Sequence, residues 1–384
     1  MDFSSNDEHI ALREAVRAIT AGFGGGYYAR KAEAREPTEE LWRKLGEHGY
    51  VGINIPEAHG GGGAGLTELA IVCEEVAGAG CPLLLLLVSS AISGEVISTY
   101  GSEDQRRRWL PRLARGESKI VFAITEPDAG SNSHRISTTA VADGDEFVLT
   151  GQKYYISGVD EAEAILVVAK TGTDESTGAA RMSLFVVDTD SPGLVKHHLP
   201  VSVTLPEKQY TLHFDNVRVG RDRLIGTEGD GFRQVFHGLN PERVTGAALC
   251  VGIGRYVLTK AVSYAGSRQV WTQPLGAHQG VSHALAKAKI EIELAALMTA
   301  RAAWLHDHGL PAGEASNMAK YAAAEAALAA VDAAIQTHGG NGLAVEYGLI
   351  PMWGLARLLR IAPVNREMVL NYVAQHTLGL PRSY

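Results

Sequence analysis

Cysteine is scarce in this sequence: 384 residues contain only Cys73, Cys81 and Cys250, with no CxxC pair and no metal-ligand spacing. This scarcity excludes a disulfide scaffold and predicts no metal site and a reduced, cytoplasmic setting. Long hydrophobic runs are missing as well. The most apolar stretch, residues 81–88, is far shorter than the roughly 20 residues that cross a bilayer. We therefore expect no membrane partner and interpret this stretch as the start of a buried helix after Pro82.

Clustered positive charge is also lacking, because the net charge is −8 and the one basic run, residues 106–108, lies beside two acidic residues. A phosphate-binding surface needs clustered Lys and Arg, so no nucleic-acid partner is expected. The glycine-rich segment "PEAHGGGGAG" lacks the GK[ST] ending of a phosphate loop. The acidic N-terminus "MDFSSNDEHI" does not resemble a signal peptide.

Three segments with different hydrophobic periods follow one another, in a chain long enough for more than one core. Residues 1–120 have apolar residues at helical spacing and predict an N-terminal helical domain. Residues 121–228 contain short β-branched stretches and a hairpin signal at Asp143-Gly144, which predict a small β-barrel or sandwich. Residues 229–384 return to the helical period and predict a four-helix bundle. The fold class is therefore mainly α with a central β domain.

The start of one bundle helix has a local signal in "LNPERV". Asn240 is a good N-cap residue and Pro241 suits the first helical position, so we expect the helix to begin here. Two long Ala- and Leu-rich helices are expected over residues 279–305 and 314–340.

Six ordered motifs carry a resemblance to a known family: "FAITEPDAGSN" (122–132), "KYYIS" (153–157), "VRVGRDRLIGTEGDGF" (217–232), "ERVTGAALCVGIG" (242–254), "SRQVWTQPLGAHQ" (267–279) and "IQTHGGNG" (335–342). Together they make the chain resemble the acyl-CoA dehydrogenase family over essentially its whole length. The resemblance implies a helical domain, a β domain and a four-helix bundle. It also implies non-covalently bound FAD, a tetramer built from dimers, and an electron-transfer flavoprotein as acceptor.

The resemblance further implies which residues bind FAD. Those around the flavin ring and ribityl chain would be Phe122, Ile124, Thr125, Gly130, Ser131, Tyr155, Ile156 and Ser157. Arg268, Trp271, Gln279, Gln336, Gly339 and Gly340 would bind the pyrophosphate and adenine of FAD in a neighbouring subunit, with Asn365 and Glu367 as further contacts. An arginine fork and exposed backbone N–H groups suit a diphosphate. Trp271 and Thr272 replace the usual Phe-Gly pair of their motif.

The chemistry of the family requires a carboxylate that removes the α-proton of a thioester while a hydride leaves the β-carbon. The common position of that glutamate falls on Pro363, which also lacks the backbone N–H that normally helps bind the thioester oxygen. A minority branch, resembling the isovaleryl- and long-chain-specific enzymes, places its glutamate before an arginine on a bundle helix. That position is Glu242 here, so we predict Glu242 as the base, with Ser131, Arg243 and Pro363 at the substrate.

Other interpretations remain open at this stage. Glu242 could simply favour a helix start or pair with Arg243, and Glu367 is a second candidate base. Because Pro363 stands at the common position of the glutamate, a flavin monooxygenase that hydroxylates amines is an alternative function. A non-catalytic FAD-binding subunit of a mixed oligomer is the third possibility. The residues are compatible with coenzyme A or a carrier protein as the holder of the acyl group, and with acyl groups of different length.

Overall fold

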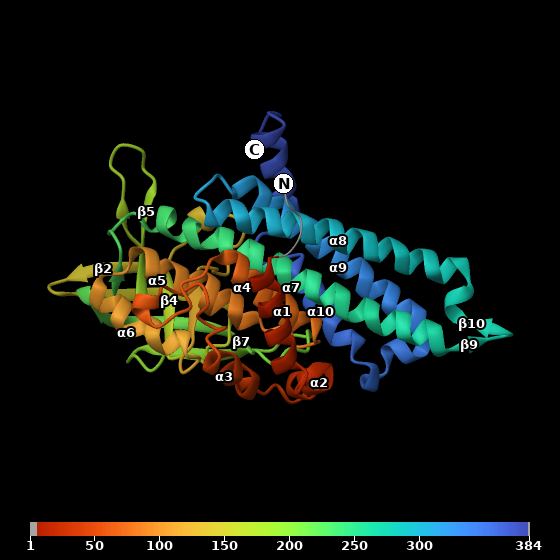
Figure 1. Cartoon of the computed structure of the whole chain (residues 1–384). Helices are drawn as coiled ribbons and strands as arrows, with labels where there is room; N and C mark the ends of the chain where they lie inside the picture. The colour runs from red at the N-terminus through yellow and green to blue at the C-terminus, as the bar shows by residue number, and fades with distance from the viewer. Residues whose placement is uncertain (1–5, 383–384) are drawn as a thin grey trace.

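A computed structural model describes residues 6–382 as an N-terminal group of helices, a central sheet and a C-terminal bundle (Figure 1). This confirms the predicted fold class. The N-terminal helices are α1 (Asp7–Thr20), α2 (Gly24–Ala34), α3 (Glu39–Glu47), α4 (Leu66–Gly78), the π-helix η2 (Leu86–Gly94), α5 (Glu95–Tyr100) and α6 (Glu103–Ala114). Within residues 6–382, no helix combines the length and apolar character needed to cross a membrane.

Eight strands are hydrogen-bonded into one sheet in the order β6-β7-β3-β2-β4-β5-β8, with β1 paired to β4. They are β1 (Ile120–Ala123), β2 (Thr139–Asp143), β3 (Glu146–Ser157), β4 (Ala164–Thr173), β5 (Ala180–Asp188), β6 (Leu194–Leu199), β7 (Gln209–Gly220) and β8 (Leu224–Ile225). The predicted hairpin is confirmed, since Asp143 pairs with Glu146 and Gly144 has φ 61° between them. β4 and β5 each bury six consecutive residues.

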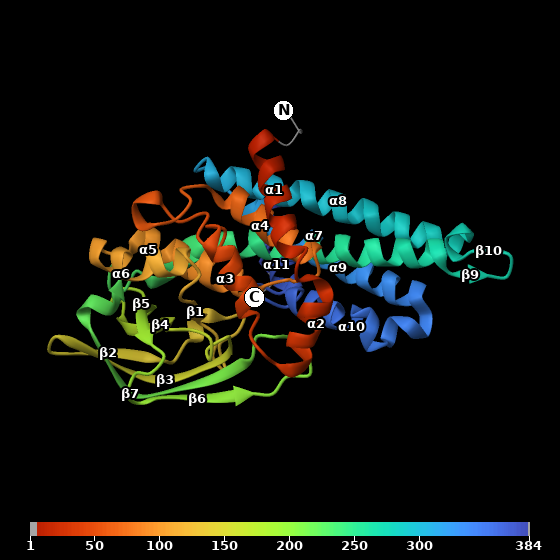
Figure 2. The ribbon, with the colours of Figure 1, turned by 60° about the horizontal axis from the view of Figure 1, so that its bottom comes forward.

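The bundle consists of α7 (Gly231–Ser267), α8 (Gln279–Asp307), α9 (Gly313–His338), α10 (Leu349–Leu359) and α11 (Arg366–Tyr372), followed by the π-helix η8 (Val373–Thr377). α7, α8 and α9 lie side by side in Figures 1 and 2. The two-stranded hairpin β9 (Gln269–Val270) and β10 (Gln273–Pro274) projects from one end of the bundle (Figure 2). Short 3₁₀ turns complete the connections: η1 (Glu57–His59), η3 (Ser133–Arg135), η4 (Arg221–Arg223), η5 (Leu275–Ala277), η6 (Gly339–Leu343) and η7 (Val345–Tyr347).

The expected helix start at Asn240 is wrong. α7 begins nine residues earlier, at Gly231, and Pro241 lies inside the helix. The Asn240 side chain accepts a hydrogen bond from Arg243 Nη1 at 2.9 Å instead of capping a helix end. Proline has no N–H to complete the helical ladder, but neighbouring turns on both sides keep the helix continuous. Glu242 is consequently a mid-helix residue, and a helix-start explanation for its presence no longer applies.

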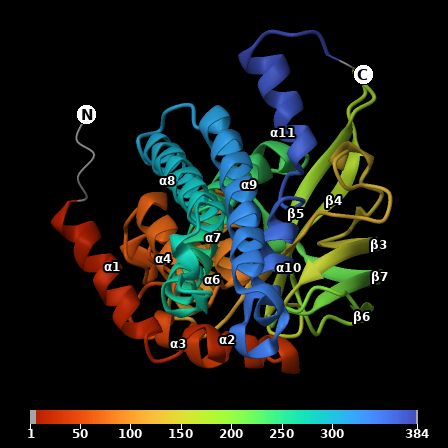
Figure 3. The same cartoon turned by 90° about the vertical axis from the view of Figure 1, so that its right-hand side faces the viewer.

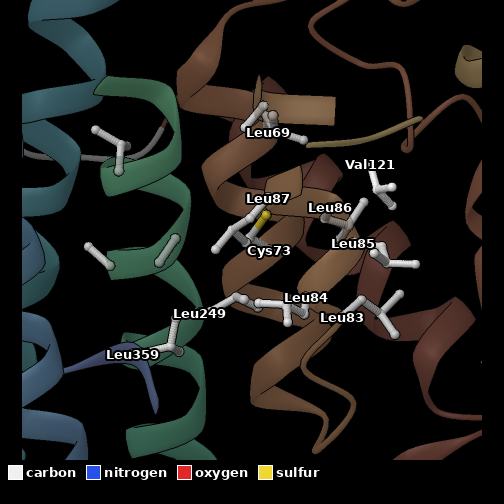
Figure 4. Packing of buried hydrophobic residues seen from close by; sticks show 14 of the residues in the cluster. Leu69, Cys73, Leu83, Leu84, Leu85, Leu86, Leu87, Val121, Leu249 and Leu359 are labelled. Atoms are coloured by element: carbon white, nitrogen blue, oxygen red, sulfur yellow. The ribbon is translucent and has the colours of Figure 1, made fainter. Parts of the chain in front are cut away.

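The predicted burial of the leucine run is confirmed. Residues 83–87 are all leucine and at most 7% exposed. Figure 4 shows them in one cluster with Leu69, Cys73, Val121, Leu249 and Leu359. Burial of one leucine is worth about 1.5–3 kcal/mol, so this contact is a major part of the core. The three cysteines are buried and free.

The three parts pack around this core in layers. Figure 3 shows the sheet on one side of the bundle and the N-terminal helices on another. β1 and η2 are in contact, as are η2 and α7. The leucine run therefore lies where the N-terminal helices, the β domain and the bundle meet.

Candidate active site

Glu242 lies on α7 where that helix faces the junction of the three parts. Its residue is half-buried. Within residues 6–382, its carboxylate forms no ion pair and no side-chain hydrogen bond, although its backbone carbonyl accepts one from Thr245 at 3.2 Å. Arg243 turns its guanidinium to Asn240 Oδ1 and the Leu239 carbonyl. The alternative in which Glu242 merely pairs with Arg243 therefore loses its support.

The electrostatics of Glu242 suit a group that must exchange a proton. Burial raises its pKa to about 7, while the positive charges of Arg243 and Lys320 act in the opposite direction. Burial likewise lowers the pKa of the Arg243 guanidinium. A carboxyl group with a pKa near 7 changes protonation state close to neutral pH, which is the range in which a general base is most effective.

The turn that carries Pro363 is held from several sides. Lys320 on α9 donates to the carbonyls of Arg360, at 3.3 Å, and of Val364. Asn365 caps α11 by accepting from Met368 N at 2.8 Å and donates to Ser131 Oγ at 2.6 Å. This last bond brings two predicted cofactor residues together although 234 residues separate them in the sequence.

The β-domain residues predicted to contact the flavin lie on two adjoining segments. The backbone N–H of Tyr154 donates to the Thr125 carbonyl at 2.8 Å, which joins the loop after β1 to β3. Tyr155 has φ 58° and is 54% exposed, so its ring projects out of the strand. Ser157 Oγ donates to Gln209 Oε1 at 3.0 Å. Phe122, Ile124 and Gly130 lie on the first segment and Ile156 on the second, where only Ile156 is fully buried.

A buried ion pair fixes these two segments relative to each other. Lys153 Nζ contacts Glu126 Oε1 at 2.9 Å and also donates to the Ile124 carbonyl at 3.1 Å. Glu126 additionally accepts from the backbone N–H groups of Ser137 and Thr138. Burial alone would raise the pKa of Glu126, but the Lys153 charge and these donors lower it to about 2. Burial lowers the pKa of Lys153 to about 8. The pair stays charged near neutral pH and clamps the loop to the strand.

The remaining predicted cofactor residues gather at the far end of the bundle. Arg268 directly precedes the β9–β10 hairpin, which projects from the bundle in Figure 2, and Gln279 begins α8 after it. Trp271 lies in the turn of the hairpin and is 87% exposed. Gln336, Gly339 and Gly340 end α9 at the same place, because the ring of His338 stacks on Tyr264 near the end of α7 at 4.3 Å. Asn341 also donates to the Tyr264 hydroxyl at 3.1 Å. The structure thus brings this second group of residues together.

Helix α7 separates the two groups. Arg268 follows Glu242 by 26 residues of nearly continuous helix, which corresponds to about 39 Å at 1.5 Å per residue. The residues around Arg268 therefore lie far along α7 from the candidate base.

Sequence reasoning missed several polar residues around the site: Glu126, Lys153, Glu207, Gln209 and Lys320. Each is less than 6% exposed, and their side chains contact predicted site segments. Glu207 accepts from the Leu84 N–H at 3.1 Å, and burial raises its pKa to about 7. A signal was available for Lys320, which is the one basic residue in the alanine-rich "MAKYAAAEAA", because a charged residue on the buried face of a helix needs partners.

The residues present fit FAD. Gln209 Nε2 is buried beside Ser157 without a hydrogen-bond partner among residues 6–382, so a polar group is available there for a ligand. At Gly130, Gly339 and Gly340, a Cβ atom would meet no other part of the described chain within 4 Å, which leaves their backbone open to close approach. The predicted cofactor residues would therefore hold the flavin of one FAD at the β-domain face and, as the resemblance implies, the diphosphate of a neighbouring subunit's FAD at the bundle end.

Comparisons with known proteins identify the family. Models of the acyl-CoA dehydrogenase N-terminal, middle and C-terminal domains match residues 6–117, 121–217 and 229–378. The chain belongs to the acyl-CoA dehydrogenase family. This acyl-CoA dehydrogenase is 53% identical to the acyl-CoA dehydrogenase FadE12 of Mycobacterium tuberculosis over 384 residues, which cover 100% of this chain and 99% of FadE12.

Solved structures agree with this assignment. The glutaryl-coenzyme A dehydrogenase glutaryl-CoA complex superposes with a TM-score of 0.94 and 31% identity, covering 100% of this chain and 98% of the other. The FAD complex of PigA superposes with a TM-score of 0.92 and 25% identity, covering 99% and 100%. This acyl-CoA dehydrogenase is thus an FAD-dependent oxidoreductase that acts on a CH–CH bond of an acyl-CoA.

Proposed function

We propose that this acyl-CoA dehydrogenase converts a saturated acyl-CoA to the trans-2-enoyl-CoA, with Glu242 removing the α-proton. The observation that carries the proposal is the state of the Glu242 carboxyl: half-buried, without an ion pair within residues 6–382, and with a pKa near 7. FAD, when bound, supplies the oxidant that accepts a hydride from the β-carbon.

The surroundings of Glu242 support this role. Gly246, one turn further along α7, presents no side chain, and a Cβ atom there would lie 3.5 Å from Leu87. Residues four apart share one helix face, so the carboxylate and the apolar leucine run border the same space. Leucine side chains exclude water from an acyl chain, while Arg243 and Lys320 favour the ionised form of the base.

The residues at the thioester are also part of the proposal. Pro363 offers no N–H to the thioester oxygen, so the donors must come from other groups around the site. Ser131, Arg243 and the turn at Pro363 would border the substrate. Coenzyme A is the carrier that the family supports.

The distribution of cofactor residues supports a homo-oligomer, with a dimer of dimers as the family resemblance implies. Because about 39 Å of helix separates Glu242 from Arg268, the Arg268 group would bind the FAD of a neighbouring copy. An electron-transfer flavoprotein would reoxidise the flavin, and we expect a cytoplasmic location and a role in fatty-acid metabolism.

The test compares wild type, Glu242→Gln and Glu367→Gln. The FAD-loaded proteins are mixed anaerobically with octanoyl-CoA, isobutyryl-CoA or 3-phenylpropionyl-CoA, and flavin absorbance is followed. Removal of a general base costs about 10²–10⁴-fold in rate. We expect Glu242→Gln to retain FAD and lose bleaching by that factor. Glu367 is the second candidate base and lies exposed on α11, so Glu367→Gln tests that alternative, and its FAD-loaded form should be bleached without this loss.

Two outcomes would contradict the proposal. If the flavin of Glu242→Gln is bleached at the wild-type rate, Glu242 is not the base. Absence of bleaching in wild type with all three thioesters, together with rapid oxygen consumption when a flavin reductase supplies reduced flavin, would instead favour a monooxygenase.

A further inference from the structure

Lys320 is the one buried ammonium that connects the bundle to the turn carrying Pro363 in the described chain. It lies in an alanine-rich part of α9 and is 2% exposed. Its Nζ donates to two backbone carbonyls, those of Arg360 and Val364, at the two ends of that turn. Burial of an ammonium group costs free energy unless its N–H groups donate hydrogen bonds. The bonds from Lys320 to the two carbonyls therefore depend on the turn keeping this geometry.

The same turn is held from its outer side by other residues. Glu325 accepts from Arg360 Nε at 2.6 Å and pairs with Arg366 Nε at 3.4 Å. Asn365 adds its bond to Ser131. These contacts are partly exposed, whereas Lys320 approaches from the bundle interior. Loss of Lys320 would therefore remove the inner support while the outer contacts persist.

Among residues 6–382, no carboxylate in contact with Lys320 neutralises its charge, because both of its hydrogen-bond partners are backbone carbonyls. The titratable groups that act on it are Glu242, Arg243 and Cys250 on α7 and Glu325 on its own helix α9. From α11, Tyr372 acts on Arg243. Glu242 in turn responds to Arg243 and Lys320. Lys320 thus supplies a positive field at Glu242 from a helix other than the one carrying the base.

We infer that Lys320 is a positioning residue: its ammonium fixes the Pro363 turn and keeps the Glu242 carboxylate ionised when substrate is to be deprotonated. This inference rests on the proposed function of Glu242. Lys320 on α9 would thus act on the Glu242 carboxylate of α7 and on the turn that precedes α11. Burial lowers the pKa of Lys320 to about 8, so the window with Glu242 ionised and Lys320 charged lies between about 7 and 8.

The test uses Lys320→Met, Lys320→Gln, Lys320→Arg and the control Lys287→Met. Lys287 is an exposed lysine of α8, paired only with Glu291 in the described structure, so its loss reports the effect of removing a surface charge. Lys320→Gln keeps an amide donor for one carbonyl and covers the case in which Lys320→Met does not fold.

Two readouts are measured between about pH 5 and 9. Infrared difference spectra titrate the protonated-carboxyl band of Glu242, which is identified by its absence from Glu242→Gln. Anaerobic flavin reduction by octanoyl-CoA gives the rate as a function of pH. In Lys320→Met and Lys320→Gln we expect the midpoint of the Glu242 titration and the acid limb of the pH–rate profile to move upward by about one pH unit. At pH values below this limb, the rate should then be ~10-fold lower than in wild type. The rate should recover at higher pH, and Lys320→Arg and Lys287→Met should titrate as wild type.

A purely structural role would give a different result. If the neutral Lys320 variants melt earlier but leave the Glu242 band and the acid limb unshifted, the inference is overturned. If wild type titrates as expected but no thioester bleaches it, the proposed base fails and the positioning role fails with it. That outcome is distinguishable, because it occurs without any substitution at Lys320.

Discussion

The crossing of α4 and α7 offers a sharp test of the packing, through Gly252→Ala. A Cβ atom at Gly252 would lie 2.3 Å from the Glu74 carbonyl oxygen, 2.6 Å from Ala77 Cβ and 2.9 Å from Gly78 N. Two of these three atoms belong to the backbone of α4 and cannot rotate away. The two helices would therefore have to separate by about 1 Å, which interiors at crystal-like density resist.

The magnitude follows from two opposing effects. Overpacking of a core typically costs about 1–3 kcal/mol, and exchange of glycine for alanine inside a helix returns up to about 1 kcal/mol. Because the Cβ atom would lie 2.3 Å from a backbone oxygen, the upper part of the overpacking range, about 2–3 kcal/mol, applies. The net loss is then about 1–2 kcal/mol, which lowers the thermal midpoint of a cooperative chain of this size by roughly 1–3 °C. The midpoint is measured by circular dichroism on the FAD-loaded protein.

Gly246→Ala is the matched control on the same helix. Among the residues that the structure describes, its Cβ would meet Leu87, at 3.5 Å, and Leu359, at 4.0 Å, and both are ordinary contact distances. This variant should melt at or slightly above the wild-type temperature because of its better helix propensity. A Gly252→Ala protein as stable as wild type, or a Gly246→Ala protein that is equally damaged, would refute the reasoning.

Three further predictions concern the site. The rate of flavin reduction in wild type should rise with pH through a midpoint near 7, because burial raises the pKa of Glu242 and the base must be ionised; a flat profile over this range would contradict the assignment. Glu126→Gln should weaken FAD retention and remove the stability that wild type loses as pH falls from 4.5 through about 2, since the folded pKa of Glu126 lies below its ordinary value; unchanged acid denaturation would contradict this. Arg268→Ala should lower FAD affinity in equilibrium dialysis while leaving the thermal midpoint of the FAD-free protein unchanged, because Arg268 is exposed; full retention of FAD would exclude it as a cofactor residue.

The parts of the fold that depend on local signals were predictable. The order of helical, β and helical segments follows from the hydrophobic period, and the Asp143-Gly144 hairpin from turn chemistry. The leucine run was predicted to be buried in the protein because it is too short to cross a bilayer, and its residues are indeed buried. Its π-helical geometry had no sequence signal, since it depends on packing against β1 and α7.

The start of α7 illustrates why a local signal can mislead. Asn-Pro at 240–241 satisfies the rules for a helix start, yet tertiary packing carries the helix through both residues. The candidate base was predicted by resemblance, whereas its electrostatic environment was not. Lys320 reaches the site from 78 residues away in the sequence, and such contacts arise only when the chain has folded.

The length of α7 also bears on how the cofactor is retained. If each FAD is held by two copies of the chain, then FAD binding and subunit association are linked, and each must strengthen the other by the same factor. Dilution would release cofactor by mass action even though no individual contact had changed. The separation of Glu242 and Arg268 along α7 would thus make flavin occupancy depend on protein concentration.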